Sequence, residues 1–365
     1  MAIQYYAADR IFTGTEWLED VVIHTIDGRI QAILPTTSVD SAAVQAYADC
    51  LIVPAFLDIQ LYGAHGRLLA VYPDPETLYA TVDYCQGGGA VLCLPTVATN
   101  SKEVLFKCID AVRQYWEEGG PGVWGLHLEG PWLNPVKRGA HIEAFIHPPT
   151  VDEVKEMLEY GKGIVKMITL APEVCSEEVI QLIQSYGVTI SAGHSNASFT
   201  QATAAFDKGI PAITHLYNAM SSLQHREPGL VGAAFLHPQV KASIIADGHH
   251  VSFEAIKIAK QVMGERLFVI TDAVTETTEG HYRHERVGDK YECNGTLSGS
   301  ALTQHQSLLN LVHQAGIEVD EAIRMCSLYP AQVIGADEIY GRIAPGYAAQ
   351  FVVLSKELAL TDVIL

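Results

Sequence analysis

The sequence predicts a (β/α)8 barrel of the TIM type, joined to a small β-sandwich domain formed by the N- and C-terminal segments. From about residue 51 the chain alternates apolar strands with amphipathic helices. This alternation implies parallel strands with right-handed crossovers, and strands that are apolar on both faces imply a sheet covered on both sides. Eight such units over 365 residues fit a closed barrel. The expected strands are residues 51–60, 90–94, 123–129, 164–170, 188–194, 212–218, 241–247 and 267–272.

A doubly wound open sheet is the alternative architecture. Dinucleotide-binding sheets of that type carry a Gly-x-Gly-x-x-Gly turn after the first strand. No such motif follows residues 51–60, and the run Gly87-Gly88-Gly89 precedes a strand instead of following one. The barrel is therefore the favoured fold.

The two chain ends are expected to form the small domain. Residues 1 to 52 contain short strand patterns around Asp27-Gly28, a strong hairpin signal. Residues 349–354 are an apolar strand, which would leave an unpaired edge unless it joined them. We therefore expect a β-domain of residues 1–52 and 344–365 beside a catalytic barrel of residues 53–343.

Capping patterns mark the helices between the strands. They occur at Asp74-Pro75-Glu76, at the start of 101–117, at Thr150-Val151-Asp152-Glu153 and at Ser198-Phe199-Thr200-Gln201. The segment after the sixth strand lacks helix signals, so an irregular functional loop is expected there. Residues 274–299 are expected to form an inserted lid with a turn at Asn294-Gly295, followed by helices at 302–315 and 320–334.

Composition excludes several classes of partner. A net charge of -19 disfavours nucleic-acid and anionic-membrane surfaces, which need clustered Lys and Arg. No run of eighteen apolar residues and no basic N-terminal region occur, so neither a membrane span nor a signal peptide is expected. Seven scattered cysteines without a Cys-x-x-Cys pattern fit reduced thiols. The expected location is the cytoplasm.

Metal-capable side chains gather at the predicted strand ends, where barrel enzymes place their chemistry. Glu129, His194 and His215 end the third, fifth and sixth strands and form a His2Glu set suited to a divalent ion with an open coordination position. Such an ion activates water and polarises a carbonyl. Asp272, at the end of the eighth strand, is the candidate general base and then general acid.

Three further positions near this rim leave alternatives open. Arg226 is either an oxyanion or phosphate binder or a surface arginine paired with Glu227. Of His249 and His250, which follow the seventh strand, one is expected to contact a ligand and the other is structural. His141 either helps to polarise a carbonyl and bind substrate or has a structural role.

The motifs together resemble the N-acetylglucosamine-6-phosphate deacetylases of the amidohydrolase superfamily along nearly the whole chain. Their combination and order are specific, although each one alone is weak. The matching blocks are Val53-Pro54-Ala55-Phe56-Leu57-Asp58, His127-Leu128-Glu129-Gly130-Pro131-Trp132, Ser191-Ala192-Gly193-His194-Ser195-Asn196-Ala197, Thr214-His215-Leu216-Tyr217-Asn218-Ala219-Met220, Arg226-Glu227-Pro228-Gly229, Ile245-Ala246-Asp247-Gly248, Thr271-Asp272-Ala273 and Thr296-Leu297-Ser298-Gly299-Ser300.

The resemblance implies a function. It implies metal-dependent hydrolysis of N-acetylglucosamine 6-phosphate to glucosamine 6-phosphate and acetate, in amino-sugar metabolism. It implies one divalent metal ion per subunit, and zinc is the expected ion. It also implies a homodimer in which Arg226 reaches the neighbouring active site. The implied roles are metal binding by Glu129, His194 and His215, catalysis by Asp272 and His141, and substrate binding by Asn218, Ala219, Arg226, His250 and His141.

The chain departs from the resemblance at the first barrel strand and in the lid. Many amidohydrolases carry His-x-His there as ligands of a second metal, whereas this chain has Gln60-Leu61-Tyr62, so one metal is expected. Tyr62 is larger than the residue expected at its position, and His65 is a weak candidate for rebuilding a second site. The lid, 274–295, matches least. Alternative functions are deacetylation of N-acetylgalactosamine 6-phosphate or another N-acyl amine and, remotely, non-catalytic sugar-phosphate binding.

Overall fold

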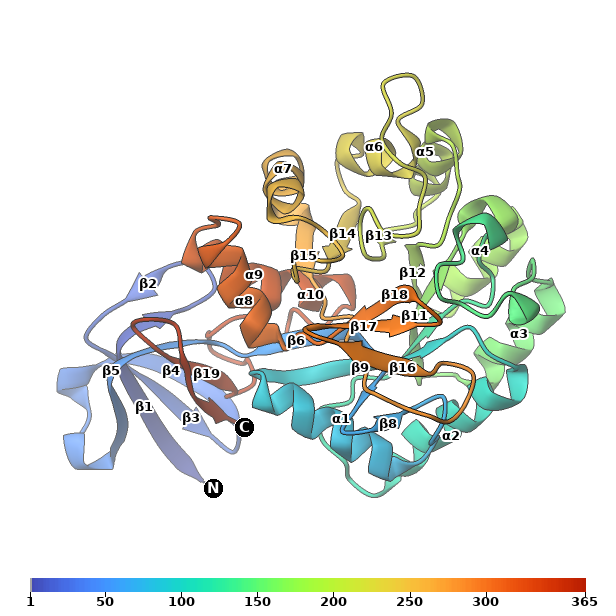
Figure 1. The fold of residues 1–365 in the computed structure, drawn as a ribbon. Coiled ribbons are helices and arrows are strands. Elements are labelled where there is room, and N and C mark those ends of the chain that lie inside the picture. The colour runs from blue at the N-terminus through green and yellow to red at the C-terminus, as the bar shows by residue number, and fades with distance from the viewer. Residues whose placement is uncertain (1) are drawn as a thin grey trace.

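The computed structural model of the protein describes residues 2–365 and has eight parallel strands arranged as a barrel beside a second, mostly antiparallel sheet (Figure 1). Neighbours in the barrel sheet follow the order β15-β14-β13-β12-β11-β10-β9-β6, which is the chain order reversed. All eight expected strands are present, and the barrel prediction is confirmed. They are β6 (Phe56–Leu61), β9 (Ala90–Ala98), β10 (Leu126–Glu129), β11 (Val165–Leu170), β12 (Thr189–Ala192), β13 (Ala212–Ile213), β14 (Lys241–Ile244) and β15 (Leu267–Val269).

The barrel closes between its last and first strands just beyond the end of β15. The Tyr62 amide donates to the Ala273 carbonyl at 2.8 Å, and the Asp272 amide donates to the Gln60 carbonyl at 2.9 Å. Below this point the buried Asp58 carboxylate accepts hydrogen bonds from the Thr271 hydroxyl and amide. The closure therefore fixes Gln60, Tyr62 and Asp272 side by side at the carboxyl ends of the strands.

Removing this carboxylate is expected to destabilise the barrel. Asp58→Ala leaves two buried Thr271 donors without partners, which should lower stability by about 2–4 kcal/mol. Burial raises the pKa of Asp58 to about 6, above its usual value. The folded state therefore binds this proton more tightly than the unfolded chain, so the wild-type advantage should be largest at low pH and shrink as pH rises through 6. Thermal denaturation at pH 5 and pH 7 measures both effects; an unchanged midpoint would contradict them.

The second sheet combines both ends of the chain, as the sequence predicts. Its strands follow the order β20-β19-β5-β1-β3-β4, and β2 pairs with β1. The expected strand 51–60 proves to be two strands, because β5 ends at Pro54 in this sheet and β6 begins at Phe56 in the barrel. The strands are β1 (Ile3–Phe12), β2 (Trp17–Leu18), β3 (Val21–Ile26), β4 (Arg29–Pro35), β5 (Val44–Pro54), β19 (Phe351–Ser355) and β20 (Leu360–Ile364).

Side-chain caps start most of the helices around the barrel. Asp74, Ser101 and Thr150 each accept a backbone N–H of the first turn. The reciprocal capping box is complete at Ser198 and Gln201, whereas Thr150 provides only its own half. The helices are α1 (Pro75–Gly87), α2 (Lys102–Glu117), α3 (Val151–Tyr160), α4 (Glu177–Ser185), α5 (Phe199–Asp207), α6 (Gly229–Leu236), α7 (Phe253–Met263) and α8 (Gln304–His313).

The expected single helix over 320–334 is wrong. Two helices occupy this stretch, α9 (Val319–Cys326) and α10 (Leu328–Val333), with Ser327 between them at φ -129° and ψ -76°. Pro330 has no N–H to donate to the carbonyl four residues earlier, so one continuous helix would lose a hydrogen bond at this point.

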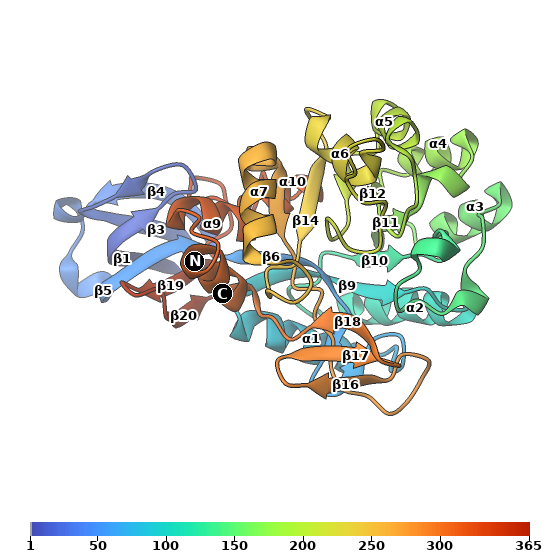
Figure 2. The ribbon, with the colours of Figure 1, turned by 45° about the horizontal axis from the view of Figure 1, so that its top comes forward.

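The insertion after β15 is a three-stranded antiparallel sheet, here called the lid sheet. It consists of β16 (His284–Val287), β17 (Lys290–Cys293) and β18 (Thr296–Ser300). Asn294 and Gly295 both have positive φ, +53° and +74°, as the expected turn requires. Figure 2 shows the lid sheet at the outer edge of the barrel. The insertion packs against the hairpin of β7 (Gly63–Ala64) and β8 (Arg67–Leu68), because Leu68 shares a buried cluster with Tyr282 and Tyr291.

No helix among residues 2–365 is long and apolar enough to cross a membrane. All seven cysteines are free, and six of them are buried. Their burial accords with the expected role as core side chains.

Candidate active site

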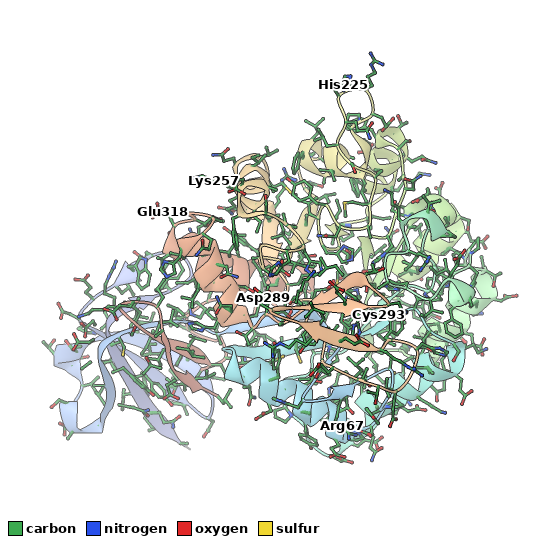
Figure 3. All side chains as sticks on the ribbon, in the orientation of Figure 1. Arg67, His225, Lys257, Asp289, Cys293 and Glu318 are labelled. Atoms are coloured by element: carbon green, nitrogen blue, oxygen red, sulfur yellow. The ribbon has the colours of Figure 1, made fainter. Side chains whose placement is uncertain are left out.

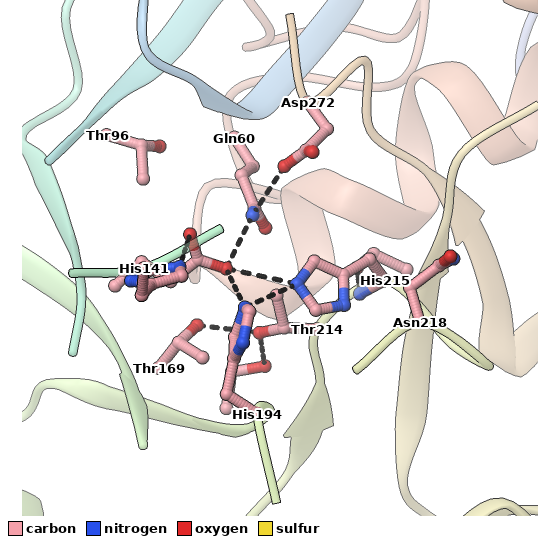
Figure 4. Close-up of polar contacts among 12 residues, drawn as sticks. Gln60, Thr96, His141, Thr169, His194, Thr214, His215, Asn218 and Asp272 are labelled. Carbon is pink, nitrogen blue, oxygen red and sulfur yellow. Dashed lines mark hydrogen bonds and ion pairs between the residues drawn. The ribbon is translucent and has the colours of Figure 1, made fainter. Parts of the chain in front are cut away.

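A cavity of about 250 Å³ opens at the carboxyl ends of the barrel strands, between the barrel and the lid sheet. It brings together eight of the nine residues predicted to bind metal, catalyse the reaction or contact substrate, and Arg226 is the exception. Figure 4 shows several of them converging on one carboxylate. The predicted residues that line it are Glu129, His141, His194, His215, Asn218, Ala219, His250 and Asp272; Tyr62 also lines it.

Three of the predicted metal-binding and catalytic residues have a left-handed backbone conformation, which is uncommon for any residue with a side chain. The φ angles are +47° at His194, +35° at His215 and +54° at Asp272. His194 and His215 lie two residues beyond the ends of β12 and β13, and Asp272 lies three residues beyond the end of β15. Such conformations cost about 1–3 kcal/mol each and cluster at functional sites. The strand ends are therefore shaped to present these side chains.

Glu129 lies at the centre of the site and is 1% exposed. Its Oε1 atom lies 3.1 Å from His215 Nε2 and 3.3 Å from His194 Nε2, and its Oε2 atom lies 3.2 Å from His141 Nε2. Burial alone would raise the pKa of this carboxyl, but the three neighbouring histidines hold it well below its usual range. Glu129 is thus an anion surrounded by imidazoles.

The predicted metal ligands form a tight triangle. Glu129 Oε1, His194 Nε2 and His215 Nε2 are separated by 3.1, 3.1 and 3.3 Å. Tetrahedral zinc with bonds of about 2.0–2.1 Å requires ligand separations of about 3.3 Å. His194 Nδ1 lies 2.9 Å from the Lys137 carbonyl oxygen, which can only accept, so the proton is on Nδ1 and the lone pair on Nε2. The donor set therefore fits a divalent ion.

His141 belongs to the same cluster but presents a different group. Glu129, His141 and His194 also hold possible ligand atoms within 4.8 Å of one another. The Thr99 backbone amide, which can only donate, lies 3.3 Å from His141 Nδ1. Nδ1 is then the acceptor and Nε2 carries the proton. His141 is consequently better suited to donate a hydrogen bond than to coordinate a metal, which favours His215 as the second histidine ligand.

Asp272 faces the cluster from the closed seam of the barrel. Its Oδ1 atom accepts a hydrogen bond from Gln60 Nε2 at 2.7 Å and lies 3.2 Å from the Tyr62 hydroxyl. Burial and the neighbouring Glu129 raise its pKa. A buried carboxylate with a raised pKa can take a proton and return it in the same site.

Gln60 and Tyr62 fill the positions at which the sequence analysis notes the missing His-x-His pair. Gln60 Nε2 lies 3.1 Å from Glu129 Oε1, and the Tyr62 hydroxyl makes a close hydrogen bond to Glu129 Oε2. Burial and the charges of Asp272 and Glu129 raise the pKa of the Tyr62 phenol well above 10, so it stays neutral. The weak alternative that His65 rebuilds a metal site is wrong, since His65 pairs with Asp83 on the surface at 3.3 Å.

The opposite side of the cavity carries the predicted substrate contacts. His250 Nδ1 lies 2.6 Å from Asp247 Oδ2, so Nε2 is the nitrogen that remains for a ligand. His249 instead pairs with Asp289, in the turn between β16 and β17, at 3.0 Å. Asn218 and Ala219 line the cavity from the irregular loop after β13, and Ala219 has a φ of +47°.

Arg226 is exposed and does not line the cavity. It lies in the loop next to His225, which Figure 3 shows at the tip of a projection away from the barrel. The alternative pairing with Glu227 is not observed among residues 2–365, because the Glu227 carboxylate instead accepts the amides of Phe199 and Gly229 at 2.7 and 3.1 Å. Arg226 is therefore free to contact a molecule outside its own chain.

Sequence reasoning missed the lid side chains that complete the cavity wall. Tyr282 donates to the Thr99 carbonyl at 2.7 Å, and His284 is buried with Nδ1 unpartnered among residues 2–365. Burial lowers the pKa of His284 to about 4. Both lie where the motif match is weakest, and aromatic side chains in a polar insertion were the only available signal.

A parallel barrel whose strand ends present one carboxylate among histidines, with a buried aspartate opposite, defines the class of metal-dependent hydrolases built on this fold. The chain belongs to the amidohydrolase family, whose sequence profile matches residues 52–364. The resemblance noted from the motifs is thereby confirmed.

Individual relatives cover nearly the whole chain. It is 31% identical over 370 residues to N-acetylgalactosamine-6-phosphate deacetylase of Escherichia coli O157:H7, with 98% of this chain and 96% of the relative covered. It is also 31% identical to N-acetylglucosamine-6-phosphate deacetylase of Haemophilus influenzae, with 94% and 93% covered. The crystal structure of N-acetylglucosamine-6-phosphate deacetylase from Pasteurella multocida superposes with a TM-score of 0.94 at 29% identity, covering 100% and 98%.

Proposed function

We propose that the protein hydrolyses the acetamide of N-acetylglucosamine 6-phosphate to glucosamine 6-phosphate and acetate. One observation carries the proposal: a single cavity joins the Glu129 cluster and Asp272 to the polar wall formed by Asn218, Ala219 and His250. A substrate with an amide at one end and an anionic group at the other fits that arrangement. Relatives with this named activity cover more than nine-tenths of the chain.

The proposed chemistry divides between two catalytic side chains. Asp272 takes a proton from the attacking water and then donates it to the leaving amine. His141 Nε2–H donates to the acetamide oxygen as negative charge develops there. The raised pKa of Asp272 suits a group that must gain and lose one proton in each cycle.

Glu129, His194 and His215 would hold one divalent ion, for which we propose zinc. Carboxylate oxygen and imidazole nitrogen are common zinc ligands, and three protein ligands leave an open position. A bound ion would polarise the acetamide carbonyl and make water at the site more acidic.

Deacetylation of N-acetylgalactosamine 6-phosphate is the second candidate. A relative named for that activity covers 98% of this chain and is as similar as those named for the glucosamine compound. The two sugars differ in the orientation of one hydroxyl, which the lid and loop side chains of the cavity would read. Another N-acyl amine, or binding of a sugar phosphate without turnover, remains as a further alternative.

Acetate release from both N-acetylhexosamine 6-phosphates and from unphosphorylated N-acetylglucosamine tests the proposal. We expect the glucosamine 6-phosphate compound to give the highest kcat/KM and the purified protein to carry about one zinc per chain. A preference for the galactosamine compound would select the second candidate. If none of the three compounds were hydrolysed, a deacetylase function would be refuted.

We propose a cytoplasmic homodimer in which Arg226 binds the phosphate in the partner's active site. The loop that carries Arg226 projects from the barrel, and its guanidinium has no carboxylate partner among residues 2–365 (Figure 3). Arginine suits phosphate because its planar group can donate two parallel hydrogen bonds.

Arg226→Ala should therefore raise KM for the phosphorylated sugar by about 10- to 100-fold, the effect of losing a charged hydrogen bond. Hydrolysis of the unphosphorylated sugar should change little. Arg113→Ala, on the surface of α2, is the matched control. An equal effect on both sugars would argue against phosphate binding, and a monomer in sedimentation analysis would argue against a contribution from a neighbour.

A further inference from the structure

Two buried carboxylates face each other across one pair of neutral donors. Glu129 is 1% exposed and Asp272 is 6% exposed. Gln60 Nε2 lies 3.1 Å from Glu129 Oε1 and 2.7 Å from Asp272 Oδ1. The Tyr62 hydroxyl makes a close hydrogen bond to Glu129 Oε2 and lies 3.2 Å from Asp272 Oδ1. Gln60 and Tyr62 are therefore the neutral groups that lie against both acids, and they reduce the cost of burying the two carboxylates side by side.

The Tyr62 hydroxyl distinguishes the two oxygens of Glu129. Oε2 is occupied by Tyr62 and by His141 Nε2, whereas Oε1 faces His194 and His215. A phenol has one proton to donate. The close contact with Glu129 Oε2 uses that proton, which leaves the 3.2 Å approach to Asp272 Oδ1 as a secondary contact. The carboxylate is thereby fixed with one oxygen toward the metal-ligating histidines.

The backbone leaves Tyr62 little freedom to move. The Tyr62 amide donates to the carbonyl of Ala273, the residue after Asp272, at 2.8 Å. The Tyr62 carbonyl accepts the Leu69 amide at 3.0 Å. Tyr62 and Asp272 are thus anchored on the same seam between the ends of β6 and β15. The Tyr62 hydroxyl and the Asp272 carboxylate therefore stay in contact, 3.2 Å apart.

We propose that Tyr62 is a positioning residue for hydrolysis. Its hydroxyl holds the Glu129 carboxylate with Oε1 toward His194 and His215, at a point 3.2 Å from Asp272 Oδ1. This inference rests on the proposed function for its catalytic consequence, but its effect on metal affinity is independent of turnover.

Tyr62→Phe tests the inference because it removes one hydroxyl and keeps the ring. Outer partners of metal ligands typically contribute 10- to 100-fold to affinity. We expect zinc affinity of the metal-free protein, measured by competition with a chelator, to fall by about that factor. With saturating zinc, kcat should fall at least about 10-fold while KM changes less than about 2-fold. Tyr115→Phe is the matched control, because Tyr115 lies on α2 and outside the cavity. This change removes a hydroxyl that donates to the Pro121 carbonyl at 2.6 Å.

A Tyr62→Phe protein with the zinc affinity and kcat of the wild type would overturn the inference. Equal losses in thermal stability for the two variants, with zinc affinity lowered only by Tyr62→Phe, would support it over a general packing effect. If the wild type hydrolyses none of the sugars, the proposed function fails. The zinc comparison still decides the role of Tyr62 in that case, and unchanged affinity would overturn it.

Discussion

Asp272→Asn is expected to reduce kcat by about 10²- to 10⁴-fold, the contribution of a general acid–base group. Asparagine keeps the size of the side chain but cannot take a proton from water or return one to the leaving amine. Because Asp272 lies outside the triangle of predicted ligands, zinc content should remain close to that of the wild type. Steady-state acetate release and metal analysis on the same sample measure both quantities.

The pH profile gives a second measure of this role. Burial and Glu129 raise the pKa of Asp272, and the general base must be ionised in the free enzyme. Wild-type kcat/KM should therefore fall as the pH drops through that pKa, and this limb should disappear in Asp272→Asn. Asp207→Asn, an exposed acid on α5, is the control for the chemical change. If Asp272→Asn had the kcat of the wild type, Asp272 would not be the general acid–base group.

Glu129→Gln is expected to empty the metal site. Glu129 supplies the only carboxylate in the predicted ligand triangle, whose other members are the imidazoles of His194 and His215. The amide of glutamine keeps the shape but removes the charge that attracts a cation and that the three histidines surround. Zinc should fall from about one per chain to a small fraction, and acetate release should fall with it.

Two observations would separate loss of metal from loss of fold. The circular dichroism spectrum of Glu129→Gln should match that of the wild type, and Glu156→Gln, a surface acid paired with Lys102, should keep both zinc and activity. If Glu129→Gln retained stoichiometric zinc, the carboxylate would not be a required ligand, and the set containing His141 would need to be reconsidered.

Much of the fold and of the site was predictable because it depends on short-range patterns. The capping box at Ser198 and Gln201 and the turn at Asn294-Gly295 are encoded within four residues. The strand-end positions of Glu129 and Asp272 follow from the barrel, which places every carboxyl end on one rim. Their convergence in one cavity is therefore a consequence of fold class.

Other features were not predictable for physical reasons. The division of 320–334 into α9 and α10 had a local signal in Pro330, but apolar periodicity continues across the break and by itself favours one helix. The burial of His284, the first residue of β16, depends on where the lid sheet lies against the barrel. Apolar periodicity within one segment locates neither the helix break at Ser327 nor the contact between the lid sheet and the barrel.

The sequence by itself determined the barrel, the β-domain built from both ends of the chain, and the set of acids and histidines at the strand ends. Only the tertiary structure decided which nitrogen of His194 and His141 carries the proton, since the Lys137 carbonyl and the Thr99 amide that decide it come from distant loops. It also decided the place of Tyr62 between two carboxylates, because Glu129 and Asp272 are separated from Tyr62 by 67 and 210 residues. Hydrogen bonds over such separations exist only after the barrel has closed.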